Sequence, residues 1–235
     1  MIKTVTPGDV QVKERESGRH TFGAYLGSEP GIDGPSARGP QAFVIEFCPG
    51  YVVEPHFHWT DQFQVFVKGH AAVGQHLLDP VSIHYTDSFT PYGPITVGDD
   101  GTTCFVLRGR ADLGAQFMPG SADKMQRKAG RALYAQTQLS LTPARTSARL
   151  ETLIEPQDDG LAVFELVAGP GAGLLAEIVE GSCRYQLVID GSLEYRDTVL
   201  PRDSVVFAAP GDRLDGRRAG PTGVHLLELQ LPAGG

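Results

Sequence analysis

Short stretches of alternating apolar and polar residues run through most of this chain, and glycine and proline separate them. Residues 62–67 read Gln-Phe-Gln-Val-Phe-Val, an alternation rich in β-branched and aromatic side chains that is typical of a β-strand. Lys68 and Gly69 then predict a turn. The 235 residues include 29 glycines and 17 prolines, which indicates many such turns. We therefore expect an all-β protein in which each half contributes about six to eight short strands.

The pattern of the first half returns in the second. Gly191 lies 122 residues after Gly69, and residues 184–191 match residues 62–69 in their alternation, their glutamine and their closing turn. A repeat of this length predicts two copies of one domain rather than a solenoid, whose units are about 20 to 50 residues long.

The amino-acid composition changes between the two copies. Ser121 is suited to cap the start of a helix, and residues 122–138 are rich in helix-forming side chains, although Gly130 weakens a single helix there. Residues 142–155 are expected to form an extended crossing segment. The predicted organisation is an N-terminal domain, a partly helical linker with its crossing segment, and a C-terminal domain, over residues 1–120, 121–155 and 156–235.

Candidate chemistry concentrates in His56-Phe57-His58, just before the strand at residues 62–67. On an extended segment, side chains two residues apart point to the same face. The two imidazoles are therefore expected side by side, an arrangement that a first-row transition metal can bridge.

The spacing around these histidines resembles the first motif of the cupin superfamily: glycine, five residues, His-x-His, three or four residues, glutamate, six residues, glycine. The matching positions hold Gly50, His56, His58 and Gly69. Gln62 stands where the family has glutamate, and Thr96 stands where the second motif, Pro-x-Gly-x-x-His, ends in histidine. The resemblance implies two cupin jelly-roll β-barrels in tandem, a bicupin whose first copy carries the metal motif and whose second copy is degenerate.

Two further histidines could complete a ligand set. His76 and His84 flank a segment with Asp79-Pro80 at its middle. If the chain bends there into a hairpin, their rings become cross-strand neighbours. We therefore predict a relocated metal site formed by His56 and His58 with one or both of these histidines.

Other polar residues are assigned supporting roles. Gln62 is either a weak metal ligand or a substrate contact. Glu54 has the same strand parity as the His-x-His pair, so it could supply the missing carboxylate or act as the catalytic base. Tyr92 and Thr96 are expected to orient the substrate, whereas His70 is expected to face solvent.

A set of imidazoles with few carboxylates suits a divalent transition metal such as Fe, Zn, Ni, Mn or Cu better than Mg or Ca, and the pattern does not select among them. In the second half His225 is the only histidine, so no metal is expected there. That half is predicted either to cover an open face of the first barrel or to form the surface of a homodimer.

Composition narrows the choice of partners. The formal net charge of −8 argues against nucleic acid, and three cysteines do not form a disulfide framework. No apolar run approaches the roughly 20 residues that span a bilayer, and the first ten residues lack the apolar core of a signal peptide. We therefore expect a cytoplasmic protein with a small-molecule substrate and no membrane partner.

Three functions fit the resemblance. The first is a metal-dependent enzyme, foremost a dioxygenase, that acts on a small oxygenated organic molecule. The second is metal-assisted isomerase, lyase or cyclase chemistry without oxygen. The third is a non-catalytic cupin that binds a small molecule, because one fold can serve many functions.

Overall fold

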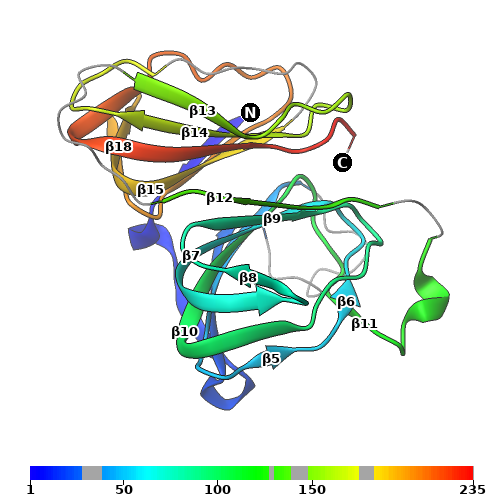
Figure 1. Ribbon diagram of the computed structural model, residues 1–235. Coiled ribbons are helices and arrows are strands. Elements are labelled where there is room, and N and C mark those ends of the chain that lie inside the picture. Colours follow the sequence, from blue (N-terminus) through cyan, green and yellow to red (C-terminus); the bar gives the residue numbers. More distant parts are fainter. Residues whose placement is uncertain (28–38, 127–129, 139–147, 175–182, 235) are drawn as a thin grey trace. The chain divides into compact units, whose positions relative to one another are not determined.

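The structure is a computed structural model, and it describes residues 1–27, 39–126, 130–138, 148–174 and 183–234 (Figure 1). Nearly all regular structure in these ranges is β-strand, which confirms the all-β prediction. Three short 3₁₀ helices accompany the strands: η1 (Pro7–Asp9), η2 (Glu16–Gly18) and η4 (Ala122–Lys124). No helix in the described ranges is long and apolar enough to cross a membrane.

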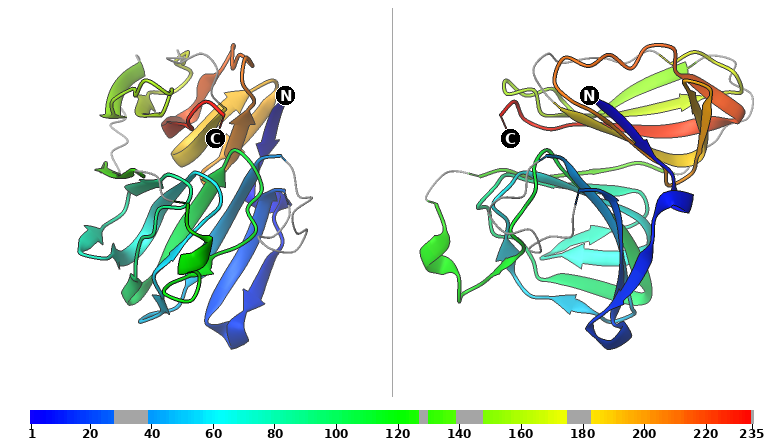
Figure 2. Two further views of the ribbon diagram at one scale, coloured as in Figure 1. Left: turned by 90° about the vertical axis from the view of Figure 1, so that its right-hand side faces the viewer. Right: turned by 180° about the vertical axis from the view of Figure 1, so that it is seen from behind.

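The chain divides into two compact units. The N-terminal unit is Gln11–Gln136, and the C-terminal unit combines Met1–Val10 with Thr137–Gly234. The predicted N-terminal domain included the first ten residues. They belong instead to the C-terminal unit, because β1 (Ile2–Val5) pairs with β17 (Val205–Ala208) of that unit. Figure 2 shows this dark blue strand beside the orange strands of that unit. A pairing between residues so distant in sequence leaves no local signal in the pattern.

The N-terminal unit is built on a nine-stranded sheet whose strands curve around an interior (Figures 1 and 2). The path of the sheet is β12 (Ala132–Gln136), β9 (Ser82–Thr86), β7 (Gln62–Val73), β10 (Ile95–Arg108), β4 (Gln41–Phe47), β3 (His20–Leu26) and β2 (Val12–Arg15). Two short strands lie off this path: β8 (His76–Leu78) pairs with β7, and β5 (Val52–Val53) pairs with β10. A separate two-stranded sheet joins β6 (His56–Phe57) to β11 (Gln116–Phe117).

Strand alternation decides what fills this interior. Phe66 and Val106 belong to one buried apolar cluster that lines it. Gln62 and Gln64 share the parity of Phe66 on β7, so their amides point to the same side. Gln64 pairs with Val106 on β10 and with His84 on β9. The sheet therefore carries a buried polar patch next to an apolar core, and polar groups so buried need hydrogen-bond partners.

The C-terminal unit contains a seven-stranded sheet. Its path is β1, β17, β15 (Arg184–Tyr195), β18 (Arg218–Gln230), β14 (Ala162–Ala168) and β13 (Ala148–Ile154), and β16 (Thr198–Pro201) pairs with β15. Its buried apolar cluster takes residues from most of these strands, including Leu166, Val188, Val206 and Leu226.

The predicted turn at Lys68 and Gly69 is wrong, because β7 continues through Gly69 to Val73, and β15 likewise continues through Gly191 to Tyr195. The sequence repeat still has a structural counterpart at these two glycines. Gly69 on β7 and Gly191 on β15 both have positive φ angles, +67° and +70°. A Cβ atom would lie 2.0 Å from the carbonyl oxygen of Gly101 at the first position and 2.2 Å from that of Gly223 at the second. Both long strands thus pass so close to a neighbouring strand at this point that only glycine fits.

The segment between the two copies is more extended than expected. Within residues 121–155, the described part contains η4 and the strands β12 and β13, but no longer helix. β12 adds to the edge of the N-terminal sheet, where Tyr134 pairs with His84. Edge pairing has therefore overridden the helical propensity of these residues, because propensity is a weak prior that tertiary contacts readily override. Residues 127–129 and 139–147 lie outside the described ranges, and with them the start of the predicted crossing segment.

Candidate functional site

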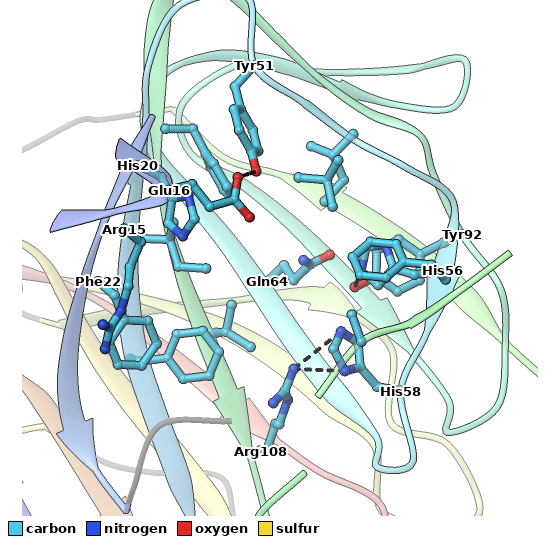
Figure 3. A pocket seen from close by; sticks show the side chains of 18 residues that line it. Arg15, Glu16, His20, Phe22, Tyr51, His56, His58, Gln64, Tyr92 and Arg108 are labelled. Atoms are coloured by element: carbon cyan, nitrogen blue, oxygen red, sulfur yellow. Dashed lines mark hydrogen bonds between the residues drawn. The ribbon is translucent and has the colours of Figure 1, made fainter. Parts of the chain in front are cut away.

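A cavity of about 290 Å³ opens into the N-terminal unit. Its walls are largely aromatic and aliphatic, with Phe22, Phe43, Ile45, Phe47 and Val106 among them. Figure 3 shows the polar side chains of His56, His58, Gln64 and Tyr92 gathered on one side, with Arg108 next to His58. Arg15, Glu16, His20 and Tyr51 line the opposite side, where Tyr51 donates to Glu16 at 2.6 Å. The pocket thus combines apolar walls with a buried polar end, a composition typical of small-molecule sites.

The His-x-His prediction is confirmed in its geometry. The rings of His56 and His58 lie 5.1 Å apart between centroids, at right angles to each other. His56 is held by a short strand pair with Phe117 and by two backbone hydrogen bonds to Tyr92, at 3.1 Å and 3.0 Å. These contacts place two buried imidazoles at the polar end of the pocket.

The hydrogen-bond partners of His56 fix its tautomer. Its Nδ1 lies 2.8 Å from the carbonyl oxygen of Glu54, which can only accept, so Nδ1 carries the proton. Its Nε2 is therefore an acceptor, and the Tyr92 hydroxyl donates to it at 2.9 Å. The same hydroxyl accepts a 2.6 Å hydrogen bond from the amide nitrogen of Gln62. Gln62, Tyr92 and His56 thus form a short chain of hydrogen bonds that ends on the Glu54 carbonyl oxygen.

Arg108 completes this network from the opposite side of Gln62. Its Nε and Nη2 donate to the amide oxygen of Gln62 at 3.0 Å and 2.8 Å, and its Nη1 donates to Gln41 at 2.7 Å. The side chain is only 2% exposed. Gln62 is therefore fully engaged as a bridge, with its oxygen turned to the guanidinium and its nitrogen turned to Tyr92.

His58 lies between a carboxylate and this guanidinium. Its Nδ1 donates to Asp112 at 2.7 Å, which leaves Nε2 as an acceptor. Nη2 of Arg108 contacts both ring nitrogens, at 3.2 Å from Nδ1 and 3.4 Å from Nε2. Burial, with the positive charge of Arg108, lowers the pKa of His58 to about 3. Burial alone would raise the pKa of Asp112, but the hydrogen bond from His58 and the charge of Arg108 outweigh it and bring that pKa to about 2. At neutral pH this end of the pocket holds a neutral imidazole and a balanced Arg108–Asp112 pair.

His84 is buried on the far side of Tyr92, with the two rings 5.0 Å apart. Its Nδ1 donates to Gln64 at 2.7 Å, and its Nε2 has no hydrogen-bond partner. Burial, followed by the nearby His76 and His56, lowers the pKa of His84 to about 3. His84 therefore belongs to the buried polar patch, but it is not among the residues that line the cavity.

The predicted hairpin between His76 and His84 is wrong. β8 and β9 do not pair with each other; both pair with β7, which is long enough to bind them one after the other. The ring of Tyr134 stacks on both histidines, with centroid distances of 3.9 Å to His76 and 4.7 Å to His84. His76 is exposed and separated from the other three histidines by this stack, so the structure does not bring it to the site.

Three other predicted positions face away from the pocket. The side chains of Glu54 and Thr96 are exposed and do not line the cavity, although the backbone carbonyl of Glu54 positions His56. Glu54 thus offers neither the missing carboxylate nor a base in this arrangement. His70 faces solvent, as expected, and is hydrogen-bonded to Asp100.

Sequence reasoning missed Arg108 and Asp112. A signal for Arg108 was present, because it ends the apolar run Cys104-Phe-Val-Leu-Arg108 with the same inward parity as Val106. A charge at an inward position of a buried strand indicates a partner inside the barrel. Asp112 lies in a loop, where no periodicity marks it.

The residues at the polar end do not form a complete set of metal ligands. Within the described ranges, no group of three or more His, Cys, Asp or Glu side chains is placed to hold an ion, and biological transition-metal sites generally use at least three protein ligands. The Gln62 oxygen is committed to Arg108. A metal about 2 Å from Nε2 of His58 would lie within about 5.5 Å of Nη2 of Arg108, given the 3.4 Å between these nitrogens. At an effective dielectric constant near 20, the guanidinium by itself would repel a divalent ion there by about 6 kcal/mol. The Asp112 carboxylate, 2.7 Å from Nδ1 of the same ring, would offset much of that repulsion.

No protein-family model and no curated protein matches this sequence. Solved structures do match the fold. A candidate dioxygenase from Nostoc punctiforme is 13% identical with a TM-score of 0.63, over 99% of this chain and 80% of that one. The pirin YhhW from Escherichia coli, in complex with nickel(II), is 10% identical with a TM-score of 0.61 and 99% coverage of both chains. Oxalate decarboxylase from Bacillus subtilis is 11% identical with a TM-score of 0.62, over 98% of this chain and 76% of that one.

These matches confirm the cupin fold that the motif predicts. At identities this low they show the fold alone, and function has to be argued from the site.

Proposed function

We propose that this chain is a bicupin whose N-terminal unit binds a small oxygenated organic molecule in the pocket beside His56, His58 and Tyr92. The observation that carries this proposal is the combination of apolar walls with a polar end whose groups are held in fixed orientations. A volume of about 290 Å³ is at the lower end of the range for small-molecule sites, roughly 300–1,000 Å³. The aromatic side chains of Phe22, Phe43 and Phe47 favour a ligand with a flat, apolar body and one oxygenated end.

The protonation state of the histidines favours binding and orientation over acid–base chemistry. A general acid or base works best when its pKa is near the working pH. Burial lowers the pKa of His56, and that of His58 to about 3. Burial also raises the pKa of Tyr92. At neutral pH the two imidazoles are therefore neutral hydrogen-bond acceptors. A ligand hydroxyl would have to compete with the hydrogen bond that Tyr92 already donates to Nε2 of His56.

A second candidate is the metal-dependent enzyme that the motif implies, a dioxygenase or else an isomerase, lyase or cyclase. The observation that favours it is the anchoring of both Nδ1 atoms, on the Glu54 carbonyl and on Asp112. Metal-binding histidines are commonly anchored in this way. A divalent transition metal would supply Lewis-acid or oxygen chemistry, and it would need donors beyond these two imidazoles.

The C-terminal unit is proposed to be a degenerate copy with a structural role. Its interior holds Arg184, Arg217 and Glu228 as a buried ion cluster, with Nη1 of Arg217 3.2 Å from the Glu228 carboxylate. The cluster occupies the interior with side chains that pair mainly with one another, while among the described residues Nε of Arg184 and Oε1 of Glu228 have no hydrogen-bond partner.

Calorimetric titration with catechol, benzoate and acetylacetone tests the proposed pocket. The wild-type protein should bind at least one of these probes, and Ile45→Trp, which fills the wall of the cavity, should weaken that binding by about tenfold or more. Leu77→Trp is the matched control, because Leu77 is 81% exposed and outside the cavity. If no probe binds, or if Ile45→Trp binds as well as the wild type, the pocket proposal is wrong.

The second candidate has its own test. Protein purified without a nickel column would be reconstituted anaerobically with Fe(II) and then mixed with oxygen and each probe. Substrate-dependent oxygen consumption that disappears in His56→Ala would support a dioxygenase, and product formation without oxygen uptake would support an isomerase, lyase or cyclase. The absence of both with every probe would leave the binding function.

A further inference from the structure

The polar end of the pocket already contains one buried cation. The Arg108 guanidinium and the Asp112 carboxylate are both almost fully buried, with Nη1 and Oδ2 3.6 Å apart. Buried charges have to be paired or bound to a counter-ion. Here one positive and one negative side chain balance each other, so the site is neutral with its own residues alone.

Arg108 also contacts two positions of the cupin metal motif, Gln62 and His58. It donates two hydrogen bonds to Gln62, at the position of the motif glutamate, and its Nη2 faces Nε2 of His58, the second histidine of the motif. A guanidinium carries five N–H donors in a planar fork, so it can hold several acceptors in fixed positions. The Arg108 side chain therefore joins Gln62 to His58 through hydrogen bonds, where a metal ion would join them through coordination.

Gln62 is matched to this arrangement as glutamate would not be. Its oxygen accepts from Arg108, and its nitrogen donates to the Tyr92 hydroxyl, which in turn donates to His56. A carboxylate has no donor for Tyr92 when ionised. Glutamine at this position and arginine at position 108 thus form a complementary hydrogen-bonded pair.

The C-terminal unit also has buried arginine side chains next to a carboxylate. Arg184 is the residue that the repeat aligns with Gln62, and it lies 3.8 Å from the Glu228 carboxylate, with both side chains almost fully buried. Arg217 reaches the same carboxylate. Each unit therefore contains buried arginine beside one carboxylate, with one arginine in the N-terminal unit and two in the C-terminal unit.

We infer that Arg108 is the resident cation of the N-terminal barrel and takes the place of a metal, so that the wild-type protein retains no divalent ion at His56 and His58. The corollary is a latent metal site. Replacing the cation and restoring the acid, in the double variant Gln62→Glu/Arg108→Met, removes the repulsion and adds a third ligand beside the two imidazoles. This inference takes its location from the proposed small-molecule site and selects the metal-free form of that proposal.

Elemental analysis after loading and dialysis tests the inference. Wild type and variants, purified without a nickel column, would be incubated with Zn²⁺, Ni²⁺ or Mn²⁺ and then dialysed. The wild type should retain no ion above a His56→Ala background, and the double variant should retain about one ion per chain with three protein ligands. Adding His56→Ala to the double variant should abolish retention. Arg110→Met, at an exposed neighbouring position, is the control and should behave like the wild type.

Two results would overturn the inference. The first is an ion retained by the wild type and lost in His56→Ala. The second is a double variant that is folded by circular dichroism and binds no more metal than the wild type. If the methionine variant does not fold, Gln62→Glu/Arg108→Gln keeps hydrogen-bonding capacity at position 108 and is measured in its place.

The same samples separate this inference from the proposed function. If the wild type binds catechol or benzoate and also retains a metal, the resident-cation inference fails and the pocket proposal stands. If the wild type is metal-free and binds no probe, the pocket proposal fails and the resident cation stands.

Discussion

The amide oxygen of Gln62 accepts hydrogen bonds from both Nε and Nη2 of Arg108, at 3.0 Å and 2.8 Å. This contact joins the end of β10 to the start of β7 inside the N-terminal unit. It also fixes the direction of the whole buried network, because the Gln62 nitrogen is then left to donate to Tyr92.

Tyr92 is the centre of that network, and Tyr92→Phe tests its contribution. The substitution keeps the ring but leaves a donor on Gln62 and an acceptor on His56 without their partner. Leaving buried polar groups unpaired costs about 1–3 kcal/mol each, so we expect a loss of about 2–4 kcal/mol in the free energy of unfolding. Urea denaturation measures it. Tyr134→Phe, which keeps the ring stacked between His76 and His84, should stay within about 0.5 kcal/mol of the wild type. Equal losses in both variants would contradict the network.

Gly191 of β15 is expected to be irreplaceable for steric reasons. Gly191 and Gly171 have the same φ of +70°, but a Cβ would meet the Gly223 carbonyl oxygen at 2.2 Å in the first and nothing within 4 Å in the second. Gly171→Ala should cost only the left-handed backbone penalty, about 1–2 kcal/mol. Gly191→Ala must also move a strand, and should cost about 3 kcal/mol or more. Thermal and urea unfolding compare the two, and similar costs would show that the close approach is unimportant.

Asp87 gives the N-terminal unit a predictable response to acid. It accepts hydrogen bonds from Tyr85 at 2.7 Å and from Arg131 at 2.9 Å. Burial alone would raise the pKa of Asp87, but these hydrogen bonds outweigh it and lower the pKa. Asp87→Asn should therefore cost about 1–3 kcal/mol at pH 7.

The sign of the pH effect follows from the lowered pKa. The folded state binds the proton of Asp87 less readily than the unfolded state, so the stabilisation is present above the unfolded pKa of about 4 and is lost as the pH falls further. The difference between wild type and Asp87→Asn should shrink from pH 7 to about pH 2.5. Asp123→Asn, at an exposed position, is the control. A difference that stays constant over this range would rule out the ionised carboxylate as its source.

The buried ion cluster of the C-terminal unit predicts a strong effect of a nearly isosteric change. Glu228 is 1% exposed and contacts Arg184 and Arg217, and Gln186 donates to it at 2.8 Å. Glu228→Gln leaves two buried guanidinium groups without their carboxylate, so we expect a loss of about 3–5 kcal/mol in unfolding free energy. Glu155→Gln, exposed in the same unit, should change little. A loss below about 1 kcal/mol for Glu228→Gln would mean that solvent or another group compensates the arginines.

The sequence by itself determined the features that repeat over a few residues. Alternation predicted β7 and β15, the repeat predicted that Gly69 and Gly191 occupy equivalent positions, and His-x-His predicted two adjacent imidazoles. These are local consequences of the two-residue period of a strand, and of a backbone conformation that glycine alone accepts without strain.

Only the tertiary structure decided what surrounds those imidazoles. The position of Arg108 against Gln62 depends on the pairing of β7 with β10, and that of Asp112 depends on a loop that returns to His58. The separation of His76 from His84 by Tyr134 depends on β12 joining the edge of the sheet. Sequence spacing carries no information about contacts between strands that are distant along the chain. The position of Arg108 beside the His-x-His pair was therefore decided by strand pairing and burial, not by the motif.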